Sequence, residues 1–195
     1  MVRAASRKLL NKLPTADEMA AAIERLQSMD DAPAVLLGAA YLDHALELLL
    51  KSEFKRKLTA DEEKRMFDGS QNAILGSFSA KIRIAYALGL VLDEVYADLL
   101  LINDIRNAFA HSLYGNVDFR NEHVLSDCNK LAYVGMWSRL LGMEVPPLHP
   151  KEIFVRTVRR IYTTFKERAD KASAFFAAYE KVRASLDAPP SGHAP

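Results

Sequence analysis

The stretch PAVLLGAAYLDHALELLL, residues 33–50, has the pattern of one long amphipathic helix. Its apolar residues recur at intervals of three and four, which is the period of a helix face. Proline fits the first turn of a helix, so Pro33 marks where this helix begins. The charged run KSEFKRK at 51–57 is expected to be a solvated helix end. The positions expected on the apolar face are Val35, Leu36, Ala39, Leu42, Leu46 and Leu49.

The rest of the chain repeats this period, and its Pro and Gly residues fall between the periodic segments. The sequence TADE occurs at Thr15–Glu18 and at Thr59–Glu62, and it has the form of a helix capping box. The sequence therefore predicts an all-α, single-domain bundle of about six or seven helices. The further helices are expected at about 15–29, from Thr59 to near Asp68, from Ser77 or Ser79 to Leu88 with Gly89 as a left-handed C-cap, at about 92–112, from Val124 to Leu141 with Trp137 as an anchor, and at about 151–186.

A chain of 195 residues is long enough for one substantial domain, which we place at 15–187. Residues 1–14 are expected to be an N-terminal extension without the apolar core of a signal peptide, and 188–195 (APPSGHAP) a disordered tail. No run of eighteen apolar residues occurs, so a membrane span is not expected. The lone Cys128 is expected to be a buried small side chain, and it fits a reducing, cytoplasmic location.

The charge balance excludes a general attraction to nucleic acid. The chain has 26 Lys and Arg against 25 Asp and Glu, which gives a formal net charge of +1. No basic recognition helix is evident, so direct sequence-specific DNA binding is not expected. A phosphate-binding glycine loop, a metal-spaced His and Cys cluster and a GxSxG elbow are also missing, so neither a cofactor nor a metal is expected.

One cluster combines a permanent cation, an amide and an imidazole at the end of one predicted helix: Arg106, Asn107 and His111. Asn107 and His111 are four residues apart and share a helix face, whereas Arg106 lies about 140° from His111. These groups suit RNA backbone cleavage without a metal, because an imidazole transfers protons and a guanidinium stabilises a charged phosphorane. The alternative is structural: His111 interacts with the helix dipole, and Arg106 pairs with Asp104 or Asp43. His44 is expected to be an ordinary core or surface histidine.

Four segments together resemble the bacterial mannitol operon repressor family. They are LLGAAYLDHALELLL at 36–50, FDG at 67–69, GSFSAKIRIAYALGLV at 76–91 and DLLLINDIRNAFAHS at 98–112. The resemblance covers roughly residues 30 to 115 and implies an all-helical repressor or co-regulator without a helix-turn-helix. Regulation would then run through a protein partner.

The segment RNAFAH at 106–111 also resembles the R-x4-H signature of HEPN domains, which include metal-independent RNases and toxins of toxin–antitoxin pairs. This resemblance implies His111 as acid–base, Arg106 as the group that stabilises the transition state, and Asn107 as the group that positions the phosphate. RNA is the partner in that alternative. A third alternative is an oligomerisation module with neither activity.

The leading hypothesis is a cytoplasmic, homodimeric regulator that acts through protein contacts. The homodimer is expected because the last predicted helix carries a long apolar stripe that is either core or a dimer seam. The stripe consists of Ile153, Ile161, Phe165, Phe176 and Tyr179.

Overall fold

The computed structural model describes residues 16–69, 73–112, 117–132, 142 and 148–187. Seven helices and no strand lie within these ranges, which confirms the predicted all-α bundle. The expected extension at 1–14 and the expected tail at 188–195 lie outside the described residues, as does Thr15 of the first TADE box. The helices are α2 (Ala16–Ser28), α3 (Asp31–Ser52), α4 (Ala60–Phe67), α5 (Phe78–Ala87), α6 (Asp93–His111), α7 (Glu122–Lys130) and α9 (Pro150–Asp187).

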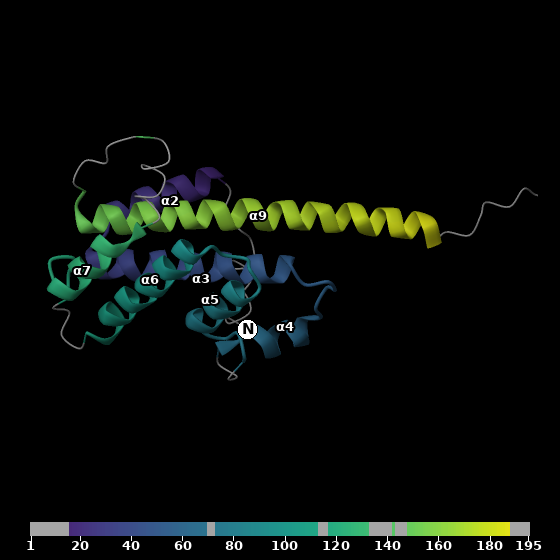
Figure 1. Ribbon diagram of the computed structural model, residues 1–195, viewed down its shortest axis with the longest axis horizontal. Coiled ribbons are helices and arrows are strands. Elements are labelled where there is room, and N and C mark those ends of the chain that lie inside the picture. Colours follow the sequence, from purple (N-terminus) through teal and green to yellow (C-terminus); the bar gives the residue numbers. More distant parts are fainter. Residues whose placement is uncertain (1–15, 70–72, 113–116, 133–141, 143–147, 188–195) are drawn as a thin grey trace, which may run out of the picture.

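Helices α3 and α9 form the centre of the bundle and pack along each other (Figure 1). Helices α5 and α6 pack against α3 and against each other, α2 contacts both α3 and α9, and α7 contacts α6 and α9. The C-terminal end of α9 extends beyond the other helices (Figure 1). The core therefore surrounds α3, which is the helix that residues 33–50 predict.

The predicted apolar face of α3 is confirmed at five of its six positions. Val35, Leu42, Leu46 and Leu49 have no exposed side-chain surface, and Ala39 is 3% exposed. The prediction was wrong for Leu36, which is 40% exposed. In this turn of α3 the buried side chains are Ala34 and Val35 instead. A Cβ atom at Gly38 would lie 3.0 Å from the Phe154 ring of α9, so glycine permits this close approach.

The predicted caps of α4 and α5 are present. The Thr59 hydroxyl accepts from the Glu62 N–H and the Glu62 carboxylate accepts from the Thr59 N–H, which is a complete capping box. The Ser77 hydroxyl accepts from the Ala80 N–H, so Ser77 rather than Ser79 caps α5. Gly89 follows α5 with φ +68°, the left-handed conformation that glycine adopts most readily.

Two predicted features of the later helices were wrong. The helix expected from Val124 to Leu141 does not continue through Leu131, where the backbone is extended (φ −61°, ψ 108°) and α7 ends at Lys130. Residues 133–141, including Trp137, lie outside the described residues. The run at 51–57 is only partly a solvated helix end, because α3 ends at Ser52 and Lys51 is a partly buried ion-pair partner.

The long last helix is confirmed to within one residue at each end. Ile161 and Phe165 are buried in the core of the protomer and Ile153 packs against it, so this part of the predicted stripe is core. The side chains of Phe176 and Tyr179 lie outside the described residues.

Helix α3 is the one helix of the described ranges that is long and apolar enough to cross a membrane by length and composition. Half of its apolar window is buried inside the protein, and the core helix of a soluble protein meets the same criterion.

Candidate functional site

The predicted cluster lies at the C-terminal end of α6. The apolar side chains Ile105 and Phe109 face the core and leave the positions between them at the surface. Arg106 and His111 are exposed, and Asn107 is half-buried. All three candidate side chains are therefore accessible from solvent.

The structure brings Arg106 and Asn107 together. The Arg106 Nη1 donates a hydrogen bond to Asn107 Oδ1 over 3.1 Å, which holds the guanidinium beside the amide. His111 is the last residue of α6, and Ser112 continues with an extended backbone (φ −69°, ψ 98°). No hydrogen bond or ion pair joins His111 to Arg106 or Asn107 within the described part of the chain. An incoming phosphate could contact the cation and the amide together, with the imidazole one helical turn away.

The internal ion pair considered for Arg106 is not found among the described residues. Asp43 instead lies 2.9 Å from the Lys81 ammonium, and Asp104 is exposed. His111 does lie in the last turn of its helix, where a cation interacts favourably with the helix dipole. The geometry therefore leaves the Arg106 guanidinium available to a ligand.

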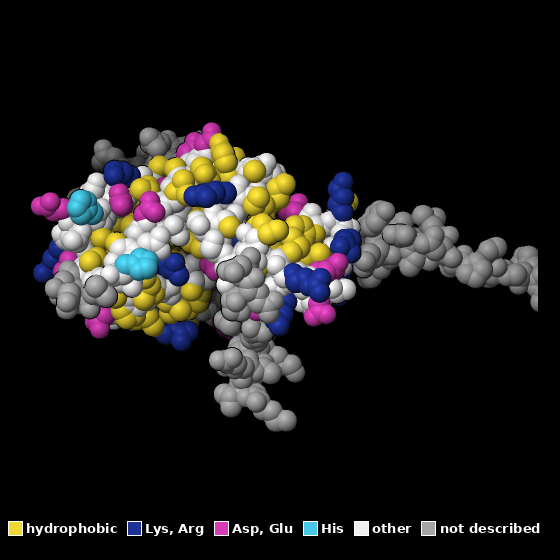
Figure 2. Space-filling view, turned by 90° about the horizontal axis from the view of Figure 1, so that it is seen from below, with side chains coloured by type: hydrophobic (Ala, Val, Ile, Leu, Met, Phe, Trp, Pro, Cys, Tyr) yellow, Lys and Arg dark blue, Asp and Glu magenta, His cyan; other side chains and the backbone are white. Residues whose placement is uncertain are grey.

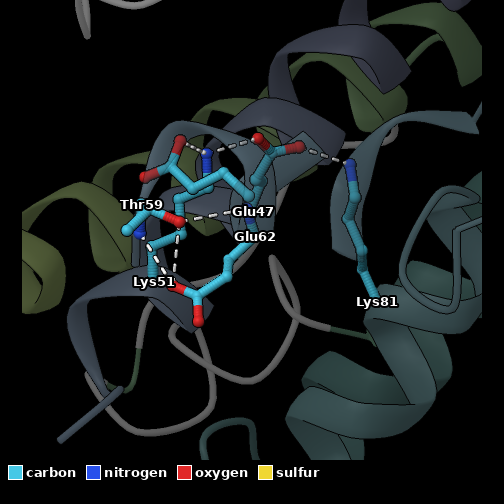
Figure 3. A network of polar contacts seen from close by, with 6 residues as sticks. Glu47, Lys51, Thr59, Glu62 and Lys81 are labelled. Atoms are coloured by element: carbon cyan, nitrogen blue, oxygen red, sulfur yellow. Dashed lines mark hydrogen bonds and ion pairs between the residues drawn. The ribbon is translucent and has the colours of Figure 1, made fainter. Parts of the chain in front are cut away.

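Sequence reasoning missed a second polar cluster, which joins three helices. The Lys81 side chain of α5 is only 3% exposed, and its ammonium lies 2.8 Å from Glu47 Oε2 and 2.9 Å from Asp43 Oδ1, both on α3. Lys51 lies 2.9 Å from Glu47 Oε1 and 3.1 Å from Glu63 Oε2 of α4. Figure 3 shows Glu47 between the two lysines. The spacing of Asp43, Glu47 and Lys51 at four-residue intervals on an apolar helix is the signal that could have found this cluster.

The charges in this cluster compensate one another. Burial opposes ionisation of the Glu47 carboxyl, but hydrogen bonds and attraction from Lys81 and Lys51 outweigh it and lower the pKa of Glu47. Burial likewise disfavours the charged form of Lys51, and its bonds to Glu47 and Glu63 nevertheless raise its pKa. Both groups are therefore ionised near neutral pH, and the cluster links α3, α4 and α5 through ion pairs.

His44 lies beside this cluster on α3 and is half-buried. Its Nε2 is buried and has no hydrogen-bond partner among the described residues. Burial is the largest cause of a lowered pKa for His44, and the opposing attraction of Glu47 does not restore it. The imidazole is thus held neutral, in agreement with an ordinary core histidine.

Cys128 is buried on α7, as predicted. Burial raises the pKa of its thiol to about 12, so the reactive thiolate is scarce at neutral pH. Within the described ranges, no group of three or more His, Cys, Asp and Glu side chains could hold a metal ion.

Most of the exposed large hydrophobic side chains of the described residues lie in the segment that contains α5. Figure 2 shows hydrophobic side chains in patches, separated by charged ones, on the face seen from below in Figure 1. Of the eight such side chains among the described residues, five lie between residues 74 and 92. We call these five side chains the α5 surface, although Ile84 and Tyr86 lie on different sides of α5, about 160° apart. They are Ile74 (80% exposed), Ile84 (38%), Tyr86 (40%), Leu88 (56%) and Leu92 (64%).

The aromatic part of the α5 surface is held in place by two contacts. The Tyr86 ring stacks on the Tyr96 ring of α6 with centroids 4.1 Å apart, and the Tyr86 hydroxyl donates to Asp93 Oδ1 over 3.0 Å. Gly89 provides the tight turn between the two helices. The result is a partly apolar surface whose tyrosine is already ordered.

Compared with protein-family models, with curated proteins and with solved structures, the chain gives no match.

Proposed function

We propose that this protein is a transcriptional regulator of the mannitol operon repressor type that acts through protein contacts. The observation that carries the proposal is the α5 surface, where Leu88 and Leu92 are more than half exposed. Exposed large apolar side chains favour protein contacts, because burying them removes apolar area from water. The four segments that resemble the repressor family include α5 itself.

Several features of the α5 surface suit a protein partner. Tyrosine is enriched at the centres of interfaces, and an already ordered Tyr86 loses little side-chain freedom on binding. Arg83, Asp93 and Glu94 are exposed in the same segment of the chain, so both signs of charge are present to orient a partner. The near-neutral chain itself is expected to bind DNA only weakly, with an affinity that falls as salt rises.

A reporter driven by the mannitol operon promoter of the host tests this proposal. Deleting the gene should raise reporter expression in the absence of mannitol, and wild-type protein should restore repression. The double variant Leu88→Asp, Leu92→Asp should not restore it, although its helical circular dichroism should match the wild type because both side chains are exposed. The matched control is Leu125→Asp, an exposed leucine on α7 outside the α5 surface, which should restore repression. Reporter expression that does not respond to the deletion would contradict the proposal.

A second candidate, an HEPN-type endoribonuclease, is favoured by the accessibility of Arg106, Asn107 and His111. In this reaction the 2′-oxygen of RNA bonds to phosphorus and loses its proton while the 5′-oxygen leaves and gains one. The products are a 2′,3′-cyclic phosphate and a 5′-hydroxyl. His111 would transfer a proton, Arg106 would stabilise the charged phosphorane, and Asn107 would position the phosphate.

The test is incubation of mixed single-stranded RNA with wild type, His111→Ala and Arg106→Ala in EDTA, with thermal unfolding measured in parallel. A nuclease should lose roughly 10² to 10⁴-fold activity in each variant while the unfolding midpoint stays constant. RNA cleavage by wild type that survives both substitutions would refute the assignment of these residues. No cleavage by any of the three proteins would remove the nuclease candidate.

A further inference from the structure

A groove separates the C-terminal half of α9 from the end of α3, the α3–α4 connection and α4. Its volume is about 450 Å³, which lies in the range of small-molecule sites. It shares no lining residue with the α5 surface or with the α6 end, so neither proposed function uses it.

One part of the groove lining consists of small or apolar side chains. On the α9 side, Ala169, Ser173 and Ala177 recur every four residues, and their small side chains leave the space open. The facing apolar side chains come from the end of α3 and from the α3–α4 connection. They are Leu48, Phe54 and Leu58.

The charged lining residues differ in whether they already have a partner. Glu63 lies 3.1 Å from Lys51, and Asp170 lies 2.7 Å from Lys166, so both acidic groups are compensated. Lys51 forms ion pairs with Glu47 and Glu63, and its ammonium also lies 4.9 Å from the Phe67 ring centroid.

The remaining two cationic side chains of the lining, Arg56 and Lys57, belong to the α3–α4 connection. Arg56 pairs with Glu62 over 2.7 Å but keeps 74% of its side chain exposed, so its guanidinium has further donors to offer. Lys57 is exposed and has no hydrogen bond or ion pair among the described residues. The groove thus combines an apolar wall with one uncompensated positive charge.

We propose that this groove binds a small amphipathic carboxylate. Its apolar body would lie against Phe54 and Leu58, and its carboxylate would pair with Lys57 and with the free donors of Arg56. Charge complementarity selects an anion over a cation, because the acidic side chains of the lining already have partners and Lys57 does not. If the protein is a regulator, such a ligand would bind it at a site separate from the α5 surface.

Octanoate is a suitable probe, and octan-1-ol is its matched neutral analogue. Titration calorimetry with the full chain should give saturable binding of one octanoate per protomer and at least severalfold weaker binding of the alcohol. Lys57→Glu should weaken octanoate binding roughly 3- to 10-fold, because it replaces a surface attraction with a repulsion. The control Lys171→Glu reverses an exposed charge on α9 outside the groove and should leave the affinity unchanged.

A second pair of variants tests the location. Ser173→Trp fills the groove and should abolish binding, whereas Ala174→Trp, at the next exposed position and outside the lining, should not. Circular dichroism should show the same helix content in both. Binding that survives Ser173→Trp, an octan-1-ol affinity equal to that of octanoate, or no saturable binding up to about 5 mM octanoate would each overturn the proposal.

Discussion

The substitution Glu47→Gln tests whether the cluster between α3, α4 and α5 stabilises the fold. Glutamine keeps the size of the side chain and removes its charge. Glu47 Oε2 accepts from Lys81 over 2.8 Å and Oε1 lies 2.9 Å from Lys51, so two buried or partly buried contacts change at once. Lys81 keeps Asp43, and Lys51 keeps Glu63.

The expected loss of stability follows from how deeply Glu47 and its two lysine partners are buried. Breaking a fully buried pair costs about 3 to 5 kcal/mol, and an exposed pair contributes about 0.2 to 1 kcal/mol. Lys81 is 3% exposed but Glu47 is 21% exposed, and each lysine retains one carboxylate. We therefore expect the free energy of unfolding to fall by about 2 to 3 kcal/mol. For a domain of this size that lowers the Tm by about 5 to 10 °C.

The loss should depend on pH in a defined direction. Burial opposes ionisation of the Glu47 carboxyl, but Lys81 and Lys51 lower its pKa below the ordinary 4.5. A lowered pKa in the folded state contributes stability in full above the unfolded value, and this stability is lost as the pH falls through the folded pKa. The difference between wild type and Glu47→Gln should stay constant from pH 7 to about pH 5 and shrink below about pH 4.5.

Urea unfolding followed by circular dichroism, at several values between pH 7 and pH 3.5, measures this difference. The control is Glu152→Gln, which removes the carboxylate of an exposed pair with Arg156 and should change stability by less than about 1 kcal/mol. A loss for Glu47→Gln no larger than the control, or a difference that does not shrink in acid, would refute the reasoning.

Three further outcomes follow from other parts of the structure. Gly89→Ala should lower the free energy of unfolding by about 1 kcal/mol, because Gly89 has φ +68°; an unchanged urea midpoint would count against this. Cys128 should resist a thiol reagent at neutral pH until urea unfolds the chain, because burial raises its pKa to about 12; fast labelling of native protein would contradict it. Phe175 of α9 is 75% exposed and could contact a second protomer. Sedimentation at tens of micromolar, roughly the range for a stable interface, should give a dimer that Phe175→Glu weakens; wild type that is only monomeric would exclude the dimer.

Local features of the chain were sufficient to predict most helix positions. The Thr59 capping box, the Ser77 cap and Gly89 act on neighbouring backbone groups, so their effects do not depend on distant residues. The break at Leu131 was missed because the apolar period of the sequence continues through it. The same period could not show that Leu36 is exposed, since that depends on the direction from which other helices cover α3.

For the candidate sites too, the sequence predicted the local features but not the contacts between helices. The sequence was sufficient to place Arg106, Asn107 and His111 near the same helix end, with Asn107 and His111 on one face, because spacing along a helix fixes these positions. It could not decide whether Arg106 is free or paired, since Asp43, one of its possible partners, lies on another helix.

Two contacts could be seen only in the folded protein. Asp43 and Glu47 pair with Lys81, 34 residues after Glu47, and Ala169 of α9 lies across a groove from the α3–α4 connection. Helical periodicity specifies which side chains share a face. Which faces meet is set by the packing of the whole core, and charges far apart in the sequence become neighbours only when that packing is complete.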